Sequence, residues 1–360
     1  MTQPLRIDNP SDFIELMPFL LGYTPQDALV VYGITNIGLA GPVMTLSLPT
    51  DPAQWRHVAQ AVASEFIHSN RGRGIDVLDV VVCLYRTPQP GQAPEATAHL
   101  LGHMADWMID AFVDLGHAPV KHVLGIVGNQ WWDYSCYWPG CCEGETLPVG
   151  DHPESVTAQL RALGYASGRT SGEIVAEFRP TQTCAARYRQ AIDQAGADFL
   201  RDTSTRHGLL LGRDSTLRII DGALRDLRND TPIGDEPAAR IILGLQDRHA
   251  RDRALSQGPA DELPYERRLW ADLARRCVPP FTDLAPPLLT LFAWVAWRQG
   301  DTASARHALR AAITLDNDYA LARQLHQGLN RDVPADRLLE AFRTAAAEDA
   351  ANDEAALRTL

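Results

Sequence analysis

The sequence lacks an apolar run long enough to cross a membrane. Its longest apolar stretches, such as residues 286–297, fall short of the roughly 18 residues that a spanning helix needs. Residues 1–10 are polar and lack the basic segment followed by an apolar one that marks a secretory signal. We therefore expect a soluble, cytoplasmic protein with no membrane partner.

Basic residues are the minority among the charged ones. The 360-residue chain has 33 Lys and Arg against 45 Asp and Glu, for a formal net charge of −12. Because nucleic-acid affinity depends on neutralising phosphates with basic side chains, this balance argues against DNA or RNA as a partner. Hydrophobic residues make up 45% of the chain, which is enough for a sizeable core and excludes a disordered chain.

The strong motifs of catalysis and cofactor binding are also missing. The chain has no HExxH zinc helix, no G-x-S-x-G nucleophile elbow and no Gly-rich dinucleotide fingerprint. Residues 208–215 approach a phosphate loop, but Arg213 stands where the lysine belongs and the segment follows a helix rather than a strand. We expect no cofactor, and the motifs leave both an enzyme and a non-enzyme open.

Strand and helix signals alternate along the first half of the chain. Residues 28–34 form a nearly continuous apolar run, typical of a buried strand, and residues 43–48 predict a second strand that pairs with it as a hairpin. The pattern also predicts strands at 75–85 and 120–127, and helices after Asn9, at 52–69 and at 93–115. We therefore predict an α/β domain with a mixed sheet over residues 1–180.

Strand signals disappear after about residue 180. Helices are predicted at 183–203, 206–228, 236–256 and 262–276, separated by Gly, Pro and Asn or Asp breakers. The tail at 345–360 is rich in Ala and acidic residues, which indicates a frayed helix. We therefore predict an all-α domain over residues 181–360.

One helix pair has a recognisable pattern over residues 286–317. Small residues at Ala293, Ala296, Gly300 and Ala305 let two antiparallel helices approach closely around a tight turn. The unit resembles one tetratricopeptide-type helix pair and nearly fits its repeat length. Because one unit does not make a solenoid, we interpret it as a packing module and only weakly as a peptide groove.

Four polar residues share one face of the predicted helix at 93–115. His99, His103, Asp106 and Asp110 are spaced as metal ligands on a helix would be. The apolar residues of this helix form the opposite face, so the polar stripe lies where solvent should be. We interpret the stripe as a solvated face and predict no metal site.

Aromatic residues and cysteines are concentrated in residues 131–145. This segment holds three of the eight tryptophans and three of the six cysteines, but the C-x4-C-C spacing does not suit a zinc site. One reading is a hairpin that caps the sheet; the other is a pocket wall with a reactive thiol. The candidate ligand-binding residues here are Trp131, Trp132, Tyr134, Cys136, Cys141 and Cys142. In a cytosolic chain all six cysteines are expected to be reduced thiols.

The loop at residues 22–27 is a second candidate site. It leads into the buried strand at 28–34, so Tyr23 and Asp27 are placed to face a ligand at the end of that strand. Pro25 and Asp27 are also ordinary turn residues, so a purely structural turn is the alternative.

A run of charges at residues 247–253 is predicted to be a self-paired surface. On one continuous helix, Asp247 and Arg251 are four residues apart, as are Arg248 and Asp252. Such pairs stabilise an exposed helix face.

Several segments resemble a known family. They are residues 20–31, the Trp131–Trp132…Cys141–Cys142 segment, residues 247–252, and the helix pair at 291–301. Together they are similar to an actinobacterial family of uncharacterised proteins, a domain of unknown function. The resemblance implies a bacterial cytosolic origin and little about activity. Residues 137–140 depart from the family pattern, in which a charged or small residue precedes a proline.

Two functional hypotheses follow. The first is an interaction or regulatory protein whose helical half binds a protein partner or a second copy of itself. The second is an enzyme or small-ligand binder with its site on the sheet, between the loop at 22–27 and the hairpin at 131–145. The second hypothesis predicts a concave pocket at the strand ends and an unusually reactive thiol.

Overall fold

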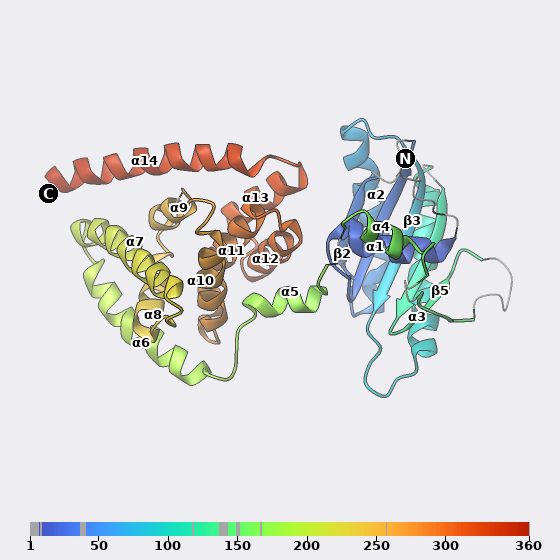
Figure 1. The fold of residues 1–360 in the computed structure, drawn as a ribbon, viewed down its shortest axis with the longest axis horizontal. Helices are drawn as coiled ribbons and strands as arrows, with labels where there is room; N and C mark the ends of the chain where they lie inside the picture. Colours follow the sequence, from blue (N-terminus) through green and yellow to red (C-terminus); the bar gives the residue numbers. More distant parts are fainter. Residues whose placement is uncertain are drawn as a thin grey trace. The chain divides into compact units, whose positions relative to one another are not determined.

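The computed structural model describes residues 7, 9–36, 41–116, 119–136, 143–148, 152–165, 168–256 and 258–359. The chain divides into two compact units, Met1–Ser171 and Gly172–Leu360. We call them the α/β unit and the helical unit (Figure 1). The predicted fold class, a mixed sheet with helices followed by an all-helical part, is confirmed.

The α/β unit contains a six-stranded sheet in the order β2-β1-β3-β4-β5-β6. Its strands are β1 (Ala28–Thr35), β2 (Val43–Ser47), β3 (Val77–Arg86), β4 (Val120–Val127), β5 (Gln130–Asp133) and β6 (Glu145–Thr146). The pair β1–β2 is the predicted antiparallel hairpin. Only β3 and β4 pair in parallel, since the other described pairs are antiparallel.

Helices cover both faces of the sheet. On one face, α2 (Trp55–Gly72) and α3 (Pro94–Asp114) pack on Val80, Val82 and Leu84 of β3. On the other, α1 (Pro10–Leu21) and α4 (Val156–Ala162) pack over Val81, Cys83 and Tyr85. The alternation follows from the pleat of a strand, which sends successive side chains to opposite faces. Because both faces are covered, β3 is apolar along almost its whole length rather than at every second residue.

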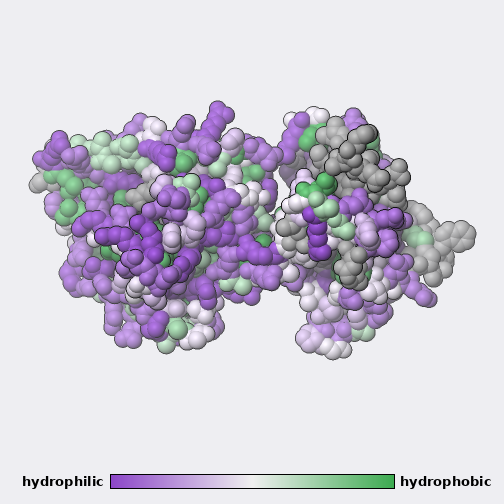
Figure 2. All heavy atoms as spheres, in the orientation of Figure 1, coloured by the Kyte–Doolittle hydropathy of each residue, from purple (hydrophilic) through white to green (hydrophobic). Residues whose placement is uncertain are grey.

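The helical unit contains helices α5 to α14, and the described part of it holds no strand. Its helices are α5 (Ser171–Phe178), α6 (Ala185–Asp202), α7 (Arg206–Arg228), α8 (Asp235–Gly244), α9 (Arg248–Ser256), α10 (Leu263–Arg276), α11 (Pro286–Arg298), α12 (Thr302–Leu315), α13 (Ala320–Asn330) and α14 (Ala335–Thr359). The centre of this unit is α11, whose residues 286–297 are all buried. The face drawn in Figure 2 is mostly hydrophilic over these helices.

The helix pair expected around residue 300 is present as α11 and α12. Gly300 makes the turn between them with a φ of 81°, a left-handed conformation that glycine adopts without strain. Asp301 then caps α12, because its side chain accepts a hydrogen bond from the Ser304 amide at 3.0 Å. None of the described helices is long and apolar enough to span a membrane.

Two helix predictions were wrong. The single helix expected at 236–256 is two helices, because Asp247 turns its carboxylate to the amides of His249 and Ala250 and starts α9. The tail expected to fray is the second half of α14, a continuous helix. Asp353, within this tail, pairs with Arg213 of α7 and Arg253 of α9. Tertiary contacts therefore stabilise a helix whose own sequence predicts fraying.

A buried carboxyl group in the helical unit generates a stability prediction. Glu266 of α10 is only 4% exposed, and burial raises its pKa to about 7. Because this pKa is above that of an unfolded glutamate, the folded state binds the extra proton and loses stability as the pH rises from about 4.5 to about 7. Glu266→Gln should remove this loss and be more stable at pH 8 by up to about 3 kcal/mol. Urea unfolding at pH 5.5 and pH 8, followed by far-UV circular dichroism, measures the difference.

The matched control is Glu340→Gln, a substitution at an exposed glutamate of α14 in the same unit. It should leave the pH dependence of the wild-type chain unchanged. A Glu266→Gln chain whose stability declined with pH as steeply as the wild type would show that Glu266 is not the titrating group.

Candidate functional site: a pocket at the strand ends

A pocket of about 460 Å³ opens in the α/β unit beyond the ends of β3 and β4. Five parts of the chain line it: α1, the loop at 24–27, the ends of β3 and β4 with the residues that follow them, residues 147–148, and α4. We call it the strand-end pocket. Its volume is within the range of roughly 300–1,000 Å³ that small-molecule sites occupy.

The position of the pocket follows from the strand directions. Because β3 and β4 are parallel, both carboxyl ends reach the same edge of the sheet. The residues that leave the sheet there, 86–88 after β3 and Gly128 after β4, form one end of the pocket. Open α/β sheets bind ligands at this edge, where loops diverge and leave space beyond the carboxyl ends of the strands.

Asp27 joins two of the segments that form the pocket. It has a φ of 45°, a conformation that costs a non-glycine residue energy. In this conformation its carboxylate accepts hydrogen bonds from the Thr87 amide at 2.9 Å and the Thr87 hydroxyl at 3.1 Å. It also lies 3.7 Å from the guanidinium of Arg86. Asp27 therefore connects the loop before β1 to the residues that end β3.

Tyr85, the penultimate residue of β3, contributes the most unusual polar group. Its side chain lines the pocket, and the residue is only 6% exposed. The hydroxyl oxygen is buried and has no hydrogen-bond partner among the described residues. Burial raises the pKa of Tyr85 well above its usual value, so the group is a neutral hydrogen-bond donor. A buried donor without a partner costs about 1–3 kcal/mol.

Charged side chains of both signs line the pocket. Arg86 donates to the Pro49 carbonyl at 2.6 Å, and Arg161 lies on α4. Burial lowers the pKa of Arg86, although Asp27 opposes this shift. Glu15 of α1 accepts from the Thr157 amide at 2.7 Å, which ties α1 to the first turn of α4. Much of the remaining wall is apolar, from Ile14, Pro18, Phe19, Ile126, Leu147 and Pro148.

The structure places the sequence-predicted residues of the loop in two environments. Asp27 lines the strand-end pocket, whereas Tyr23 is buried beside it. The Tyr23 hydroxyl lies 3.4 Å from the Thr45 hydroxyl of β2. Of the predicted loop at 22–27, the last four residues, 24–27, therefore line the pocket.

The predicted residues of the aromatic segment do not lie together. Trp131 packs in the core beneath α1, and Trp132 packs in the core beneath α2 and α3, because they alternate along β5. Tyr134 donates to the Ala98 carbonyl at 2.6 Å and so contacts α3. None of these three residues is among those that line the strand-end pocket.

The cysteines differ from the expectation of six reduced thiols. Cys136 is disulfide-bonded, and Cys83, Cys184 and Cys277 are free. Cys141 and Cys142 lie outside the described residues.

Two other sequence predictions had opposite outcomes. The stripe His99, His103, Asp106 and Asp110 is exposed on α3, as expected of a solvated face. The self-paired surface at 247–253 was wrong. Asp247 pairs with Arg213 of α7, because it caps α9 and its side chain points away from Arg251. Arg251 pairs with its neighbour Asp252 and with Tyr319.

Most residues of the strand-end pocket were not found by sequence reasoning. Tyr85 was assigned to a central strand that ended there, Arg86 was left outside that strand, and Ile14 and Phe19 were assigned to the helix after Asn9. A tyrosine and an arginine ending an otherwise apolar strand were the available signal. The sequence pattern did not show that this strand end faces α1 and α4.

Comparison with known proteins identified one related family. The family model described as Domain of unknown function (DUF4192) matches residues 10–336. No curated protein and no solved structure matched the chain.

The free thiols should differ sharply in reactivity. Burial raises the pKa of both Cys83 and Cys277 to about 12, whereas Cys184 is partly exposed. At pH 8 the two buried residues should hold on the order of a thousandfold less thiolate than an ordinary thiol. N-ethylmaleimide should label Cys184 first, as measured by peptide mass spectrometry of the native protein. Equal labelling of all three cysteines before unfolding would contradict this burial.

Proposed function

The chain belongs to the DUF4192 family, a domain of unknown function, and we propose from its own geometry that it binds a small molecule in the strand-end pocket. The observation that carries the proposal is Tyr85, a residue that lines the pocket and whose buried hydroxyl has no partner among the described residues. Such a group is costly in the free protein and becomes favourable when a ligand supplies an acceptor.

The strain at Asp27 supports the same proposal. Its left-handed backbone and its bonds to Thr87 hold the pocket loop in one shape before a ligand arrives. Local strain of this kind collects at binding sites, where the surrounding contacts maintain it. A preformed pocket also reduces the ordering cost of binding.

The walls of the pocket define the class of ligand. An apolar body would contact Ile14, Phe19 and Ile126, and an acceptor oxygen or nitrogen would lie at Tyr85. Asp27 and Arg86 already neutralise each other at the strand ends, so no strong net charge on the ligand is required. We therefore propose a small, mainly apolar molecule with a carbonyl, hydroxyl or ring-nitrogen acceptor.

A second candidate function is protein interaction through the helical unit. The α11–α12 pair with its Gly300 turn supports the resemblance to one tetratricopeptide-type unit, and α13 follows as a further helix. We propose self-association or a protein partner for this unit. A size measurement in solution tests self-association: a chain that stays monomeric at high concentration would contradict it. Actinobacterial origin and a cytoplasmic location stay predictions from the sequence.

Tyr85→Phe tests small-molecule binding with two opposite effects. Without the hydroxyl, the free protein should be equally stable or about 1 kcal/mol more stable, because an unsatisfied buried group is gone. The same substitution should weaken a ligand that accepts a hydrogen bond from Tyr85 by about tenfold. A thermal-shift screen of small acceptor-bearing compounds finds the ligand, and calorimetry on both chains measures the affinities.

The matched control is Tyr265→Phe, which removes a hydroxyl from α10 in the other unit. It should leave ligand affinity unchanged. If Tyr85→Phe destabilised the free protein as an ordinary lost hydrogen bond does, and left every ligand affinity intact, the hydroxyl would be structural and the proposal would fail.

A further inference from the structure

One face of helix α14 packs against other helices of the helical unit, and the residues on this face change from apolar to acidic along the helix. Leu339, Phe342, Ala346, Asp349 and Asp353 recur every three or four residues, so they lie on one face of the helix. The first three are apolar: Leu339 and Ala346 are buried, and Phe342 contacts Trp294. The last two are carboxylates at positions where packing normally selects apolar side chains. The second half of α14 therefore presents carboxylates, rather than apolar side chains, to the helices that it packs on.

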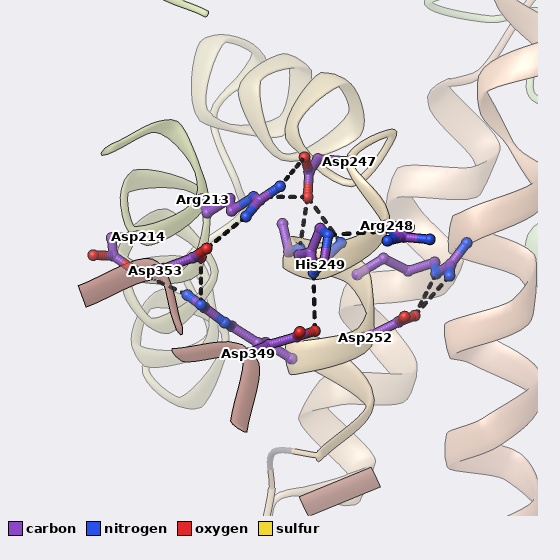
Figure 3. A network of polar contacts seen from close by, with 11 residues as sticks. Arg213, Asp214, Asp247, Arg248, His249, Asp252, Asp349 and Asp353 are labelled. Carbon is purple, nitrogen blue, oxygen red and sulfur yellow. Dashed lines mark hydrogen bonds and ion pairs between the residues drawn. The ribbon is translucent and has the colours of Figure 1, made fainter. Parts of the chain in front are cut away.

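That surface is formed by basic side chains of α7 and α9 (Figure 3). The carboxylate of Asp353 bridges Arg213 of α7 and Arg253 of α9, one oxygen to each guanidinium. The side chains of Arg213 and Arg253 are only 10% and 7% exposed. One turn earlier on α14, Asp349 lies 2.9 Å from Nδ1 of His249. We call Arg213, His249 and Arg253 the basic triplet.

Contacts other than those of α14 orient the basic triplet. Asp247 accepts a hydrogen bond from Nη2 of Arg213 at 3.2 Å and caps α9 at the same time, which places His249 in the first turn of that helix. Asp214 of α7 lies 3.2 Å from Arg253. Arg213 and Arg253 are therefore each held by a carboxylate outside α14 as well as by Asp353. Charge-assisted bonds of this kind are specific to geometry as well as to charge.

We propose that the basic triplet is a docking site for an acidic helix of a partner protein, and that α14 occupies it within the chain. The partner helix would carry two carboxylates four residues apart, matching the spacing of Asp349 and Asp353. The family match ends at residue 336, so the basic triplet lies within the matched residues and almost all of α14 beyond them. The second half of α14 is bound to the basic triplet mainly by ion pairs. A partner helix with the same carboxylates can therefore compete with α14 and displace it.

The proposal is independent of the strand-end pocket, which lies in the other unit. It specifies the kind of partner for the second candidate function. It rests on that function only in assuming that the helical unit binds a protein. A helical unit that bound no partner through α11 to α13 would leave the basic triplet testable by itself.

The test uses the full-length chain and a labelled peptide of residues 335–360 as the probe. Asp349→Asn with Asp353→Asn should release the second half of α14 and free the basic triplet. Fluorescence anisotropy should then show at least tenfold tighter binding of the peptide to this double variant than to the wild-type chain. Raising the salt concentration from 50 to 200 mM should weaken the binding, because the contact is ionic.

Two controls isolate the carboxylates from the fold. Glu348→Gln with Glu354→Gln changes the charge of α14 equally at exposed positions and should behave like the wild-type chain. A peptide with both aspartates replaced by asparagine should bind neither chain. Circular dichroism should show that the Glu348/Glu354 control keeps the helix content of the wild-type chain and that the aspartate variant loses no more than the second half of α14.

Three results would overturn the proposal. The double variant could bind the peptide no better than the Glu348/Glu354 control does. The neutralised peptide could bind as well as the acidic one, which would show apolar docking. A duplex oligonucleotide could bind the freed surface more tightly than the peptide, which would make phosphate rather than a helix its ligand.

Discussion

The parallel pairing of β3 with β4 is the constraint on which the α/β unit depends. A parallel pair cannot be joined by a tight turn, so the chain must cross over through α3 before β4 begins. That crossover covers one face of the sheet, and α1 and α4 cover the other. The two carboxyl ends then share one edge, and the strand-end pocket forms there because the segments that leave the strands diverge.

Buried polar groups have different consequences in the two units. In the α/β unit, the Tyr85 hydroxyl is neutral and lacks a partner among the described residues, so it favours an acceptor from outside. In the helical unit, Glu266 is buried and its pKa is raised, so it makes stability depend on pH. Both groups cost the free protein stability, and Tyr85 is among the residues that line a pocket large enough for a ligand.

Arginines with two carboxylate partners join the helices of the helical unit. Arg267 of α10 contacts Glu177 of α5 and Asp301 before α12. Arg276 contacts Asp272 and Asp235, and Arg213 and Arg253 share Asp353 of α14. Few of these pairs are close in sequence, so they specify which helix packs on which. Burying a guanidinium is favourable only when such partners satisfy it, which gives these contacts specificity more than stability.

The sequence by itself determined the elements whose signals are local. The apolar run of β1, the β-branched run of β3, the helix starts and the Gly300 turn all depend on neighbours within a few residues. The bounds of these elements were predicted to within a few residues. The order of the two parts, α/β first and helical second, was also predicted. The candidate site was predicted only through Asp27 and its loop, since turn residues before a buried strand are a local signal too.

Only the tertiary structure decided what depends on contacts distant in sequence. Trp131 and Trp132 were grouped as one pocket wall, yet the pleat of β5 sends them into opposite cores. Arg213 pairs with Asp247, 34 residues away, and with Asp353, 140 residues away, and neither partner could be read from a local pattern. Tyr85 became a candidate ligand-binding residue only when α1 and α4 enclosed the end of β3. Sequence patterns report the period of a strand or helix, whereas a pocket or an ion-pair network requires elements that the fold alone brings together.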